Sequence, residues 1–413
     1  MDMNTALIPE EVVQIGESLI RFVDREVAPI EAANQAVLSS ERTIFDERGR
    51  FTAEVEALRR QVRMKSAEAG FYTMLGPQEI GGGGLGPLAA VYLNAVLSAH
   101  CGPGRPLIHP VVIPSPFTNG LSPVLAALDP SLRDRYLPQL GSGDKTLCFG
   151  LSEPDAGSDV FAMKTRAVRD GDDWVVTGSK QWITNGPYAD YAMIFAITDP
   201  ELVAQRKGGI TGFFVDTKWP GFDVVSTIPI MGQLGAEIGI LSFDGLRVPD
   251  THRLGQVNEG LKVALKGVNT GRLGLSATCI GLARWALVQA VEYAKVRKTF
   301  GKPIGDHQAV QILLAESAAE IYAAETMLVD CALKLERGAR ALAETSMVKL
   351  HCTDAANRVF DRCMQVHGGM GLTNELRLEA GYRFTRSMRI PDGTSEIQRR
   401  TIARDLLAHG VNF

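Results

Sequence analysis

The spacing of apolar residues divides the chain into three blocks. From Pro9 to about Leu140, apolar side chains recur every three or four residues, which predicts helices. Between Lys145 and Arg253, short β-branched and aromatic runs alternate with turns and predict a small antiparallel β domain. Helical spacing returns after Gly260. We therefore expect an α+β, mostly α fold, with an N-terminal α-helical domain, a middle β domain and a C-terminal helical bundle at residues 1–144, 145–253 and 254–413.

One apolar stripe in the last block predicts how its helices pack. Its members alternate steps of four and three residues, which places them on one face of a helix of about seven turns. They are Val310, Leu314, Ser317, Ile321, Ala324, Leu328, Cys331 and Leu335. Long helices with such stripes pack as antiparallel bundles, so we expect this stripe to lie in a core.

Composition narrows the class of protein. The chain has 413 residues, of which 45% are hydrophobic and 22% charged, as is typical of a globular protein with more than one core. The formal net charge is only −4, and no block of five or more Lys or Arg occurs. Neither nucleic acid nor an acidic membrane is therefore favoured as a partner, and a small-molecule substrate fits better.

The N-terminal segment and the cysteines indicate the cellular setting. Met1 to Glu11 shows no basic segment followed by an apolar one, and the chain has no uninterrupted apolar run of about 18 residues. We therefore expect a cytoplasmic protein without membrane insertion. The six cysteines are scattered without a CxxC pair, which argues against disulfides or a zinc site and predicts buried thiols.

Three familiar motifs lack the context that their chemistry requires. Gly81 to Gly86 match GxGxxG, but no strand precedes them, so we expect a flexible loop rather than a dinucleotide-binding βαβ unit. Ser152 follows Gly150 as in a hydrolase nucleophile turn, but Pro154 replaces the second glycine. The histidines have no metal-binding spacing, so we expect no metal.

Two pairs of dense polar and glycine-rich segments remain. The first pair is Leu151–Asp159 and Gly178–Gly186, and the second is Gln365–Gly371 and Pro391–Gln398. Taken alone, the Pro-Asp-Gly at the start of the last segment is typical of a turn, and the glycines of the third segment are typical of a helix end.

Taken together, these segments resemble the signatures of the acyl-CoA dehydrogenase family. Arg297–Lys302 and His307-Gln308 add two further matches, and the order and spacing agree over nearly the whole chain. The resemblance implies that the C-terminal block is a four-helix bundle, that the protein binds FAD, and that it assembles as a homotetramer. It also implies an oxidoreductase that acts on CH–CH donors in fatty acid or acyl-CoA catabolism.

The resemblance implies which residues bind FAD. In this family the cofactor lies extended between the β domain and the bundle and reaches into a neighbouring subunit. Phe149, Leu151 and Ser152 match positions that line the flavin ring, while Trp182 and Thr184 match those that stack beside the ring and reach N5. The positions that match contacts to the rest of the cofactor are Arg297, Phe300, Gln308, Thr394 and Glu396, with Gln365, Gly368 and Gly369 from a second subunit.

The implied reaction is α,β-dehydrogenation of an acyl-CoA thioester. Asp392 matches the base that removes the α proton while the β hydrogen leaves as hydride to flavin N5. Ser158, Arg272 and Gly393 match substrate-binding positions. The thioester carbonyl is polarised by the backbone N–H of the base residue and by a ribityl hydroxyl of FAD. The acceptor usual for the family is an electron-transfer flavoprotein.

The base loop departs from the usual family pattern. Most members carry Tyr-Glu where this chain has Pro391-Asp392, and the shorter side chain leaves a deficit on the order of 1 Å, which can lower the rate about a hundredfold. Gly271 occupies the helix position that holds the base in other branches. Asn269 and Phe384 replace acidic residues near CoA and before the loop. We therefore expect a branched, alicyclic or otherwise unusual acyl group.

Two other functions stay open from the sequence. A nitroalkane-oxidising relative also resembles this fold, uses Asp at the base position and needs no CoA, although Ser158 and Arg272 weigh against it. A non-catalytic structural flavoprotein subunit would keep the flavin signatures and stabilise a heteromeric partner without turning over.

Overall fold

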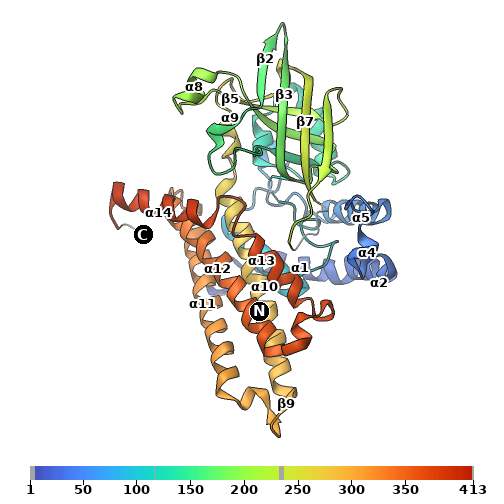
Figure 1. Cartoon of the computed structure of the whole chain (residues 1–413), viewed down its shortest axis with the longest axis vertical. Coiled ribbons are helices and arrows are strands. Elements are labelled where there is room, and N and C mark those ends of the chain that lie inside the picture. The colour runs from blue at the N-terminus through green and yellow to red at the C-terminus, as the bar shows by residue number, and fades with distance from the viewer. Residues whose placement is uncertain (1–4, 116, 232–236, 412–413) are drawn as a thin grey trace. The chain divides into compact units, whose positions relative to one another are not determined.

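The chain forms two compact units, each assembled from separate segments (Figure 1). The computed structural model describes residues 5–115, 117–231 and 237–411, and only the backbone of Thr5 and Asn269. The helical unit comprises Met1–Arg25, Gly86–Arg105 and Asn269–Phe413, and the sheet unit comprises Glu26–Leu85 and Pro106–Val268.

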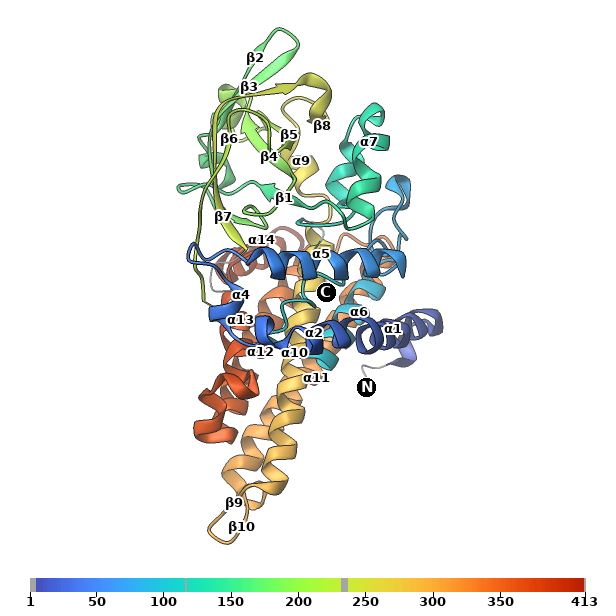
Figure 2. The same ribbon diagram turned by 90° about the vertical axis from the view of Figure 1, so that its right-hand side faces the viewer.

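The helical unit is built on three long helices, α10 (Val268–Val296), α11 (Gln308–Glu336) and α12 (Leu342–His367). α11 packs on α12, and α12 also packs on α13 (Leu378–Ser387) and α14 (Ser395–His409). α6 (Pro87–Cys101) contacts both α11 and α1 (Glu10–Phe22). A small hairpin, β9 (Lys298–Thr299) and β10 (Lys302–Pro303), joins α10 to α11 at the end of the bundle away from α14 (Figure 2).

The stripe predicted on α11 is confirmed as a core face over its middle. Ser317, Ile321, Ala324, Leu328 and Cys331 are buried, and the first two and last members of the stripe are half-buried. The stripe packs because α11 lies along α12, whose own buried face includes Val348, Cys352, Ala355 and Val359.

The sheet unit holds the strands and the shorter helices. Its helices are α2 (Ala28–Ala33), α3 (Gln35–Leu38), α4 (Glu41–Ile44), α5 (Ala53–Glu68), α7 (Pro130–Gly141), α8 (Pro200–Ala204) and α9 (Gly260–Ala264). Its strands are β1 (Leu147–Gly150), β2 (Arg166–Asp170), β3 (Asp173–Thr184), β4 (Tyr191–Ile197), β5 (Ile210–Asp216), β6 (Phe222–Thr227), β7 (Ile238–Pro249) and β8 (Arg253–Leu254).

The strands form one sheet in the order β6-β7-β3-β2-β4-β5-β8, with β1 added beside β4. Most neighbours are antiparallel, as the sequence predicts, but β4 pairs in parallel with both β1 and β2. Apolar spacing does not determine strand direction, so these two parallel pairings emerge only from the structure.

β4 is the centre of the sheet unit's core. All seven of its residues are buried, and they alternate between two apolar clusters on opposite faces of the sheet. Tyr191, Met193, Phe195 and Ile197 belong to one cluster, and Ala192, Ile194 and Ala196 belong to the other. Burial on both faces gives the rigid platform from which β1 and β3 project the site residues described below.

The GxGxxG segment is a loop, but it is closely packed rather than flexible. A Cβ on Gly82 would lie 2.2 Å from the carbonyl oxygen of Gly76, and one on Gly83 would lie 2.8 Å from the backbone of Met74. The amide of Gly83 also donates to the carbonyl of Thr73, 3.0 Å away. Gly82 and Gly83 are therefore required for close backbone approach within this loop.

The predictions on thiols and metals can be compared with the described residues. All six cysteines are free and buried, as predicted. Within the described ranges no group of three metal-ligating side chains occurs. One described helical span, Thr270–Val296, is long and apolar enough to cross a membrane, but the core helix of a soluble protein meets the same criterion, and 56% of its apolar window is buried.

Candidate active site

Asp392 lies in a tight turn between α13 and α14. Its φ of 55° and the 93° of Gly393 are both left-handed, a conformation that Asp tolerates better than most residues and glycine best. Thr394 then caps α14, because its hydroxyl accepts from the amide of Ile397 at 3.3 Å. The turn predicted from the Pro-Asp-Gly sequence is present, and it delivers Asp392 beside two long helices.

Four hydrogen bonds hold the carbonyl groups of this loop. Arg272 Nε donates to the carbonyl oxygen of Asp392 at 2.9 Å, and Lys349 Nζ donates to that of Gly393 at 2.9 Å. Gln398 Nε2 donates to both oxygens, at 3.0 Å each. Arg272 comes from α10, Lys349 from α12 and Gln398 from α14, so three helices fix the two peptide planes that follow the candidate base.

The surroundings of the Asp392 carboxyl group make it a stronger base than a solvated aspartate. Burial raises its pKa, and the cations of Arg272 and Lys349 only partly offset this effect. Burial also lowers the pKa of Lys349 to about 8, while Asp392 acts to raise it. Among the described residues no side chain hydrogen-bonds the Asp392 carboxylate, which leaves its oxygens available to accept a proton.

In the sheet unit, a buried ion pair joins two of the sequence motifs. Lys180 on β3 donates to Glu153 at 2.6 Å and to the carbonyl of Leu151 at 3.2 Å. Burial would raise the pKa of Glu153, but Lys180 and the amides of Lys164 and Thr165 outweigh it and hold that pKa below its usual value. Burial lowers the pKa of Lys180 to about 8, so its ammonium stays protonated at neutral pH.

This ion pair fixes the residues that match flavin-ring contacts. The carbonyl of Ser152 accepts from the amide of Gln181 at 2.9 Å, which ties the loop after β1 to β3. The register of β3 against β7 shifts between Lys180 and Ile183, and in this bulge Trp182 has a φ of 65° and is 54% exposed. Thr184 follows at the end of the strand and is half-buried.

The remaining sheet-unit candidates divide between packing and surface. Phe149 packs between Phe117 and Phe195, with ring centroids 5.2 and 5.0 Å away, and Leu151 is half-buried against the same core. Ser158 is exposed in the loop that precedes Val160. Trp182 is therefore the most exposed of the residues that match flavin-ring contacts, and the half-buried members of this set are Phe149, Leu151, Ser152 and Thr184.

A third group of candidates lies at the hairpin end of the bundle. Arg297 and Phe300 flank the end of α10, Gln308 begins α11, and α12 ends at His367, whose ring stacks on that of Tyr293 at 4.5 Å. Gln365, Gly368 and Gly369 therefore belong to this end as well. Arg297 lies roughly 37 Å along the helix axis from Arg272, at 1.5 Å per residue, so this group is remote from the Asp392 loop of the same chain.

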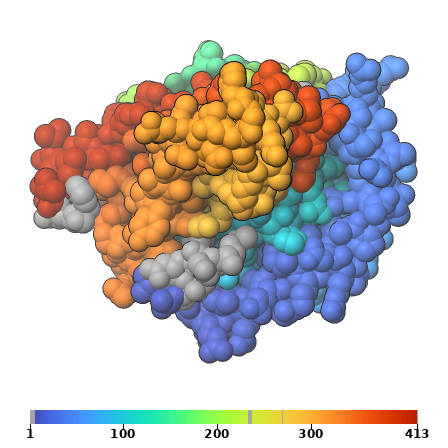
Figure 3. All heavy atoms as spheres, turned by 90° about the horizontal axis from the view of Figure 1, so that it is seen from below, coloured from blue at the N-terminus to red at the C-terminus, as the bar shows by residue number. Residues whose placement is uncertain are grey.

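The exposed features at these positions fit FAD. Phe300 is 97% exposed and belongs to the hairpin segment between α10 and α11. Figure 3 views the molecule from below, with the orange part of the chain that contains this segment toward the viewer. Within the described part of the chain, Arg297 has no ion-pair partner, and a Cβ on Gly368 or Gly369 would meet nothing within 4 Å. The flat ring of Phe300 can stack on a ring of a dinucleotide. The guanidinium of Arg297 and the open backbone at Gly368 and Gly369 can bind its pyrophosphate. Thr394 and the exposed Glu396 lie instead at the start of α14.

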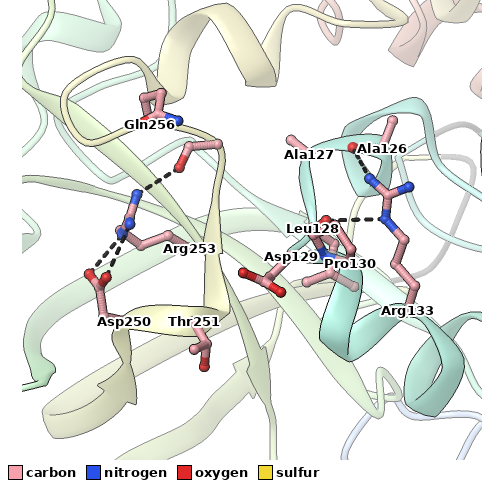
Figure 4. Close-up of a pocket in the computed structure, with 11 residues that line it drawn as sticks. Ala126, Ala127, Leu128, Asp129, Pro130, Arg133, Asp250, Thr251, Arg253 and Gln256 are labelled. Carbon is pink, nitrogen blue, oxygen red and sulfur yellow. Dashed lines mark hydrogen bonds and ion pairs between the residues drawn. The ribbon is translucent and has the colours of Figure 1, made fainter.

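A separate cavity of about 300 Å³ in the sheet unit contains none of the predicted site residues (Figure 4). Arg133 donates to the carbonyls of Ala126 and Leu128, and Arg253 pairs with Asp250. Both guanidinium groups point to partners within the protein, so this cavity offers no free charge for a substrate anion.

The site geometry agrees with the comparison to known families. Family models for acyl-CoA dehydrogenase match in chain order, with the N-terminal domain at residues 9–144, the middle domain at 148–246 and the C-terminal domain at 258–407. The chain belongs to the acyl-CoA dehydrogenase family. Members of this family act as oxidoreductases on acyl-CoA and bind FAD, and the predicted fold class is confirmed. The three domain boundaries and the individual site residues stay predictions.

Three known proteins illustrate the range of this family. The mitochondrial short-chain specific acyl-CoA dehydrogenase of Bos taurus is 33% identical over 400 residues, which are 97% of this chain and 91% of that one. Subunit CarC of the caffeyl-CoA reductase–Etf complex of Acetobacterium woodii is 34% identical over 343 residues, 83% of this chain and 88% of that one. A glutaryl-CoA dehydrogenase from Mycobacterium smegmatis, solved in complex with FADH2, has a TM-score of 0.80 and 25% identity, covering 99% of this chain and 97% of that one.

Sequence reasoning missed two buried lysines. Lys180 lies in the segment Gly178–Gly186 and had no predicted role there, and Lys349 lies in no motif. Both are fully buried in the structure, and both bind carbonyl oxygens of loops that carry predicted site residues. A lysine within an apolar helical stripe such as that of α12 is the one signal that could have drawn attention to Lys349.

Proposed function

We propose that this acyl-CoA dehydrogenase family member catalyses the FAD-dependent α,β-dehydrogenation of an acyl-CoA thioester, with Asp392 as the base. The observation that carries the proposal is the Asp392 loop. It presents a carboxylate of raised pKa, with no side-chain hydrogen bond among the described residues, on a backbone held by three helices. A base with a pKa raised toward the working pH transfers protons more effectively.

The backbone of the same loop supports the second requirement of the reaction. The α proton of a thioester is weakly acidic, so the carbonyl oxygen must be stabilised as negative charge develops on it. The amide N–H of Asp392 has no acceptor within the described residues, whereas the carbonyl oxygens of Asp392 and Gly393 both accept hydrogen bonds from side chains of the helices. We assign this N–H to the thioester carbonyl oxygen.

FAD, when bound, supplies the acceptor for the β hydrogen, which leaves as hydride. Trp182, Thr184 and Ser152 are the residues of the sheet unit that would hold its ring, because the exposed Trp182 and the half-buried Thr184 and Ser152 lie on a strand and a loop fixed by the Glu153–Lys180 pair. Arg297 and Phe300 would bind the phosphates and the adenine end from a neighbouring subunit, since they are remote from Asp392 in their own chain. This arrangement requires an oligomer, and we propose a homotetramer.

The substrate is proposed to be a branched or alicyclic acyl-CoA. Asp392 is one methylene shorter than glutamate, so a straight chain in the usual pose would leave the α proton too far from the base by on the order of 1 Å. Gly271 is buried and supplies no carboxylate from α10. The side chain of Asn269, which also bears on specificity, lies outside the described residues.

The electron acceptor is proposed to be an electron-transfer flavoprotein. The similarity to a subunit of a caffeyl-CoA reductase–Etf complex supports this partner, and it also makes reduction of an enoyl-CoA a second candidate activity. The same base and the same N–H serve both directions, because each step of a reversible reaction uses the same groups. A cytoplasmic location is part of the proposal.

The experiment that tests the proposal is an anaerobic titration followed by flavin absorbance. The panel comprises butyryl-CoA, octanoyl-CoA, isobutyryl-CoA, cyclohexanecarboxyl-CoA and nitroethane, with Asp392→Asn as the control. Bleaching by the branched or alicyclic thioester and not by nitroethane supports the proposal. Bleaching by nitroethane alone supports nitroalkane oxidation, and a flavin that no compound reduces in the wild-type protein supports a structural subunit.

A further inference from the structure

We propose that Lys349 is a positioning residue that holds the Gly393 carbonyl, and with it the Asp392 loop, in the geometry that proton abstraction requires. The catalytic meaning of this inference rests on the proposed function, but the loop contact itself does not.

The chemical setting of Lys349 is unusual for a lysine. Its side chain is fully buried, yet within the described residues its hydrogen bond goes to a backbone carbonyl, that of Gly393, and not to a carboxylate. Buried ammonium groups are otherwise found paired with carboxylates, because removing the charge from water is unfavourable. Burial lowers the pKa of this group to about 8, because removal from water disfavours the ammonium, while the charge of Asp392 acts in the opposite direction. A residue kept for packing alone would not carry a charge here.

The groups that face Lys349 place it in the base loop. They are the Asp392 carboxylate, the Cys279 thiol and the Arg272 guanidinium, with Asp354 further along α12. Asp354 is already paired with Arg389 at 2.6 Å. Among the described residues, no cation is hydrogen-bonded to the Asp392 carboxylate. Lys349 binds the loop that carries Asp392 and balances its negative charge.

The pattern of hydrogen bonds explains why a fixed donor is needed at this point. Gly393 has a φ of 93° and carries no side chain, so the peptide that follows it can rotate unless the Gly393 carbonyl is held. Lys349 and Gln398 together use both acceptor sites of that carbonyl. Arg272 and Gln398 hold the Asp392 carbonyl in the same way, so both peptides that follow the Asp392 side chain are tied to α10, α12 and α14.

The test compares Lys349→Met with the matched control Ser346→Ala in the FAD-loaded enzyme. Ser346 is equally buried on α12, one turn earlier, and its hydroxyl donates to the carbonyl of Leu342 and not to the loop. Amide hydrogen exchange of the segment 388–398 reports on the loop without any substrate. We expect exchange there to accelerate about ten- to hundredfold in Lys349→Met, the effect of losing one hydrogen bond from a charged donor, and not in Ser346→Ala.

Stability and kinetics separate positioning from a structural role. Lys349→Met keeps the volume but removes the ammonium that balances Asp392 and binds Gly393, so a lower melting temperature is expected, and kcat per folded enzyme separates positioning from stability. With the best acyl-CoA of the panel, kcat should fall about tenfold or more while KM changes less than about threefold. Lys349→Gln, which keeps a neutral donor, should recover part of the exchange protection.

Each outcome decides a different question. Wild-type exchange in the loop of Lys349→Met overturns the inference, and so does a lowered melting temperature with kcat unchanged per folded enzyme. If Lys349→Met fails to fold, Lys349→Gln is measured instead. Unchanged loop exchange together with a lowered melting temperature in Lys349→Gln also overturns the inference. If the loop loosens as expected but no acyl-CoA reduces the wild-type flavin, the proposed function fails and the positioning role stands.

Discussion

The raised pKa of Asp392 suits a catalytic base but lowers the stability of the folded chain at neutral pH. Its carboxyl group has a pKa raised by burial, which means that ionising it is less favourable in the folded than in the unfolded chain. The folded state therefore binds more protons than the unfolded state between the ordinary carboxyl pKa and the raised one. Stability from this residue is lost as the pH rises through that window, and at neutral pH the ionised group lowers stability.

The Asp392→Asn variant should consequently lose activity without losing stability. We expect turnover to fall about 10²- to 10⁴-fold, the usual effect of removing a general base. Its free energy of unfolding at pH 7 should equal or exceed that of the wild type, with the difference vanishing at acidic pH. Urea unfolding at pH 4 and pH 7, alongside steady-state kinetics, measures both effects, and a variant less stable than wild type only at pH 7 would contradict this account.

Gly393 is required by conformation and by space. A Cβ there would lie 2.7 Å from Gln398 Nε2 and 3.3 Å from the Arg272 guanidinium, and the residue would have to adopt a φ of 93°. Gly393→Ala should displace the donors that hold the loop and destabilise it by about 1–3 kcal/mol. We expect lower kcat with retained FAD, measured as flavin content of the purified variant. As a control, Gly157→Ala, where nothing lies within 4 Å of the added Cβ, should behave like the wild type.

At the scale of elements, the sheet unit depends on a buried ion pair between β3 and the loop after β1. Glu153 and Lys180 are nearly inaccessible, and Glu153 also accepts from two backbone amides. Removing one partner leaves an uncompensated buried charge, whereas exposed pairs contribute little.

Lys180→Met should therefore destabilise the protein by about 3–5 kcal/mol and reduce flavin content. The matched control is Lys164→Met, because Lys164 pairs with Asp155 at the same 2.6 Å on the exposed side of the same loop. Its effect should be small by comparison, because an exposed ion pair contributes little to stability. Urea denaturation measures both, and equal losses in the two variants would show that burial does not govern this pair.

Helical and strand elements were predictable to different degrees. The α11 stripe and the β character of the middle block follow from local spacing, which is visible in the sequence. The parallel pairing of β4 with β1 and β2, and the bulge that exposes Trp182, depend on contacts between distant segments. Local spacing of apolar residues therefore does not predict such contacts.

On the scale of the whole molecule, a complete cofactor site is proposed to need two subunits. A mixture of inactive variants tests this directly. We expect Asp392→Asn and Arg297→Ala each to have low activity and an equimolar mixture, reassembled from dissociated subunits, to recover up to about a quarter of intact sites by random pairing. Activity after reassembly and mass by light scattering are the measurements. No recovery despite mixed oligomers would mean that both residues serve the site of one chain.

The sequence alone determined the family and the order of helical and β blocks, because these follow from local spacing and from motifs of fixed order, and it predicted which residues meet the cofactor and the substrate. Only the tertiary structure decided what holds the site in place. Lys349 reaches Gly393 across 44 positions and Lys180 reaches Glu153 across 27. Each contact exists because packing removes a charged amine from water and leaves a carbonyl or a carboxylate within reach, and no local pattern in the chain encodes that distance.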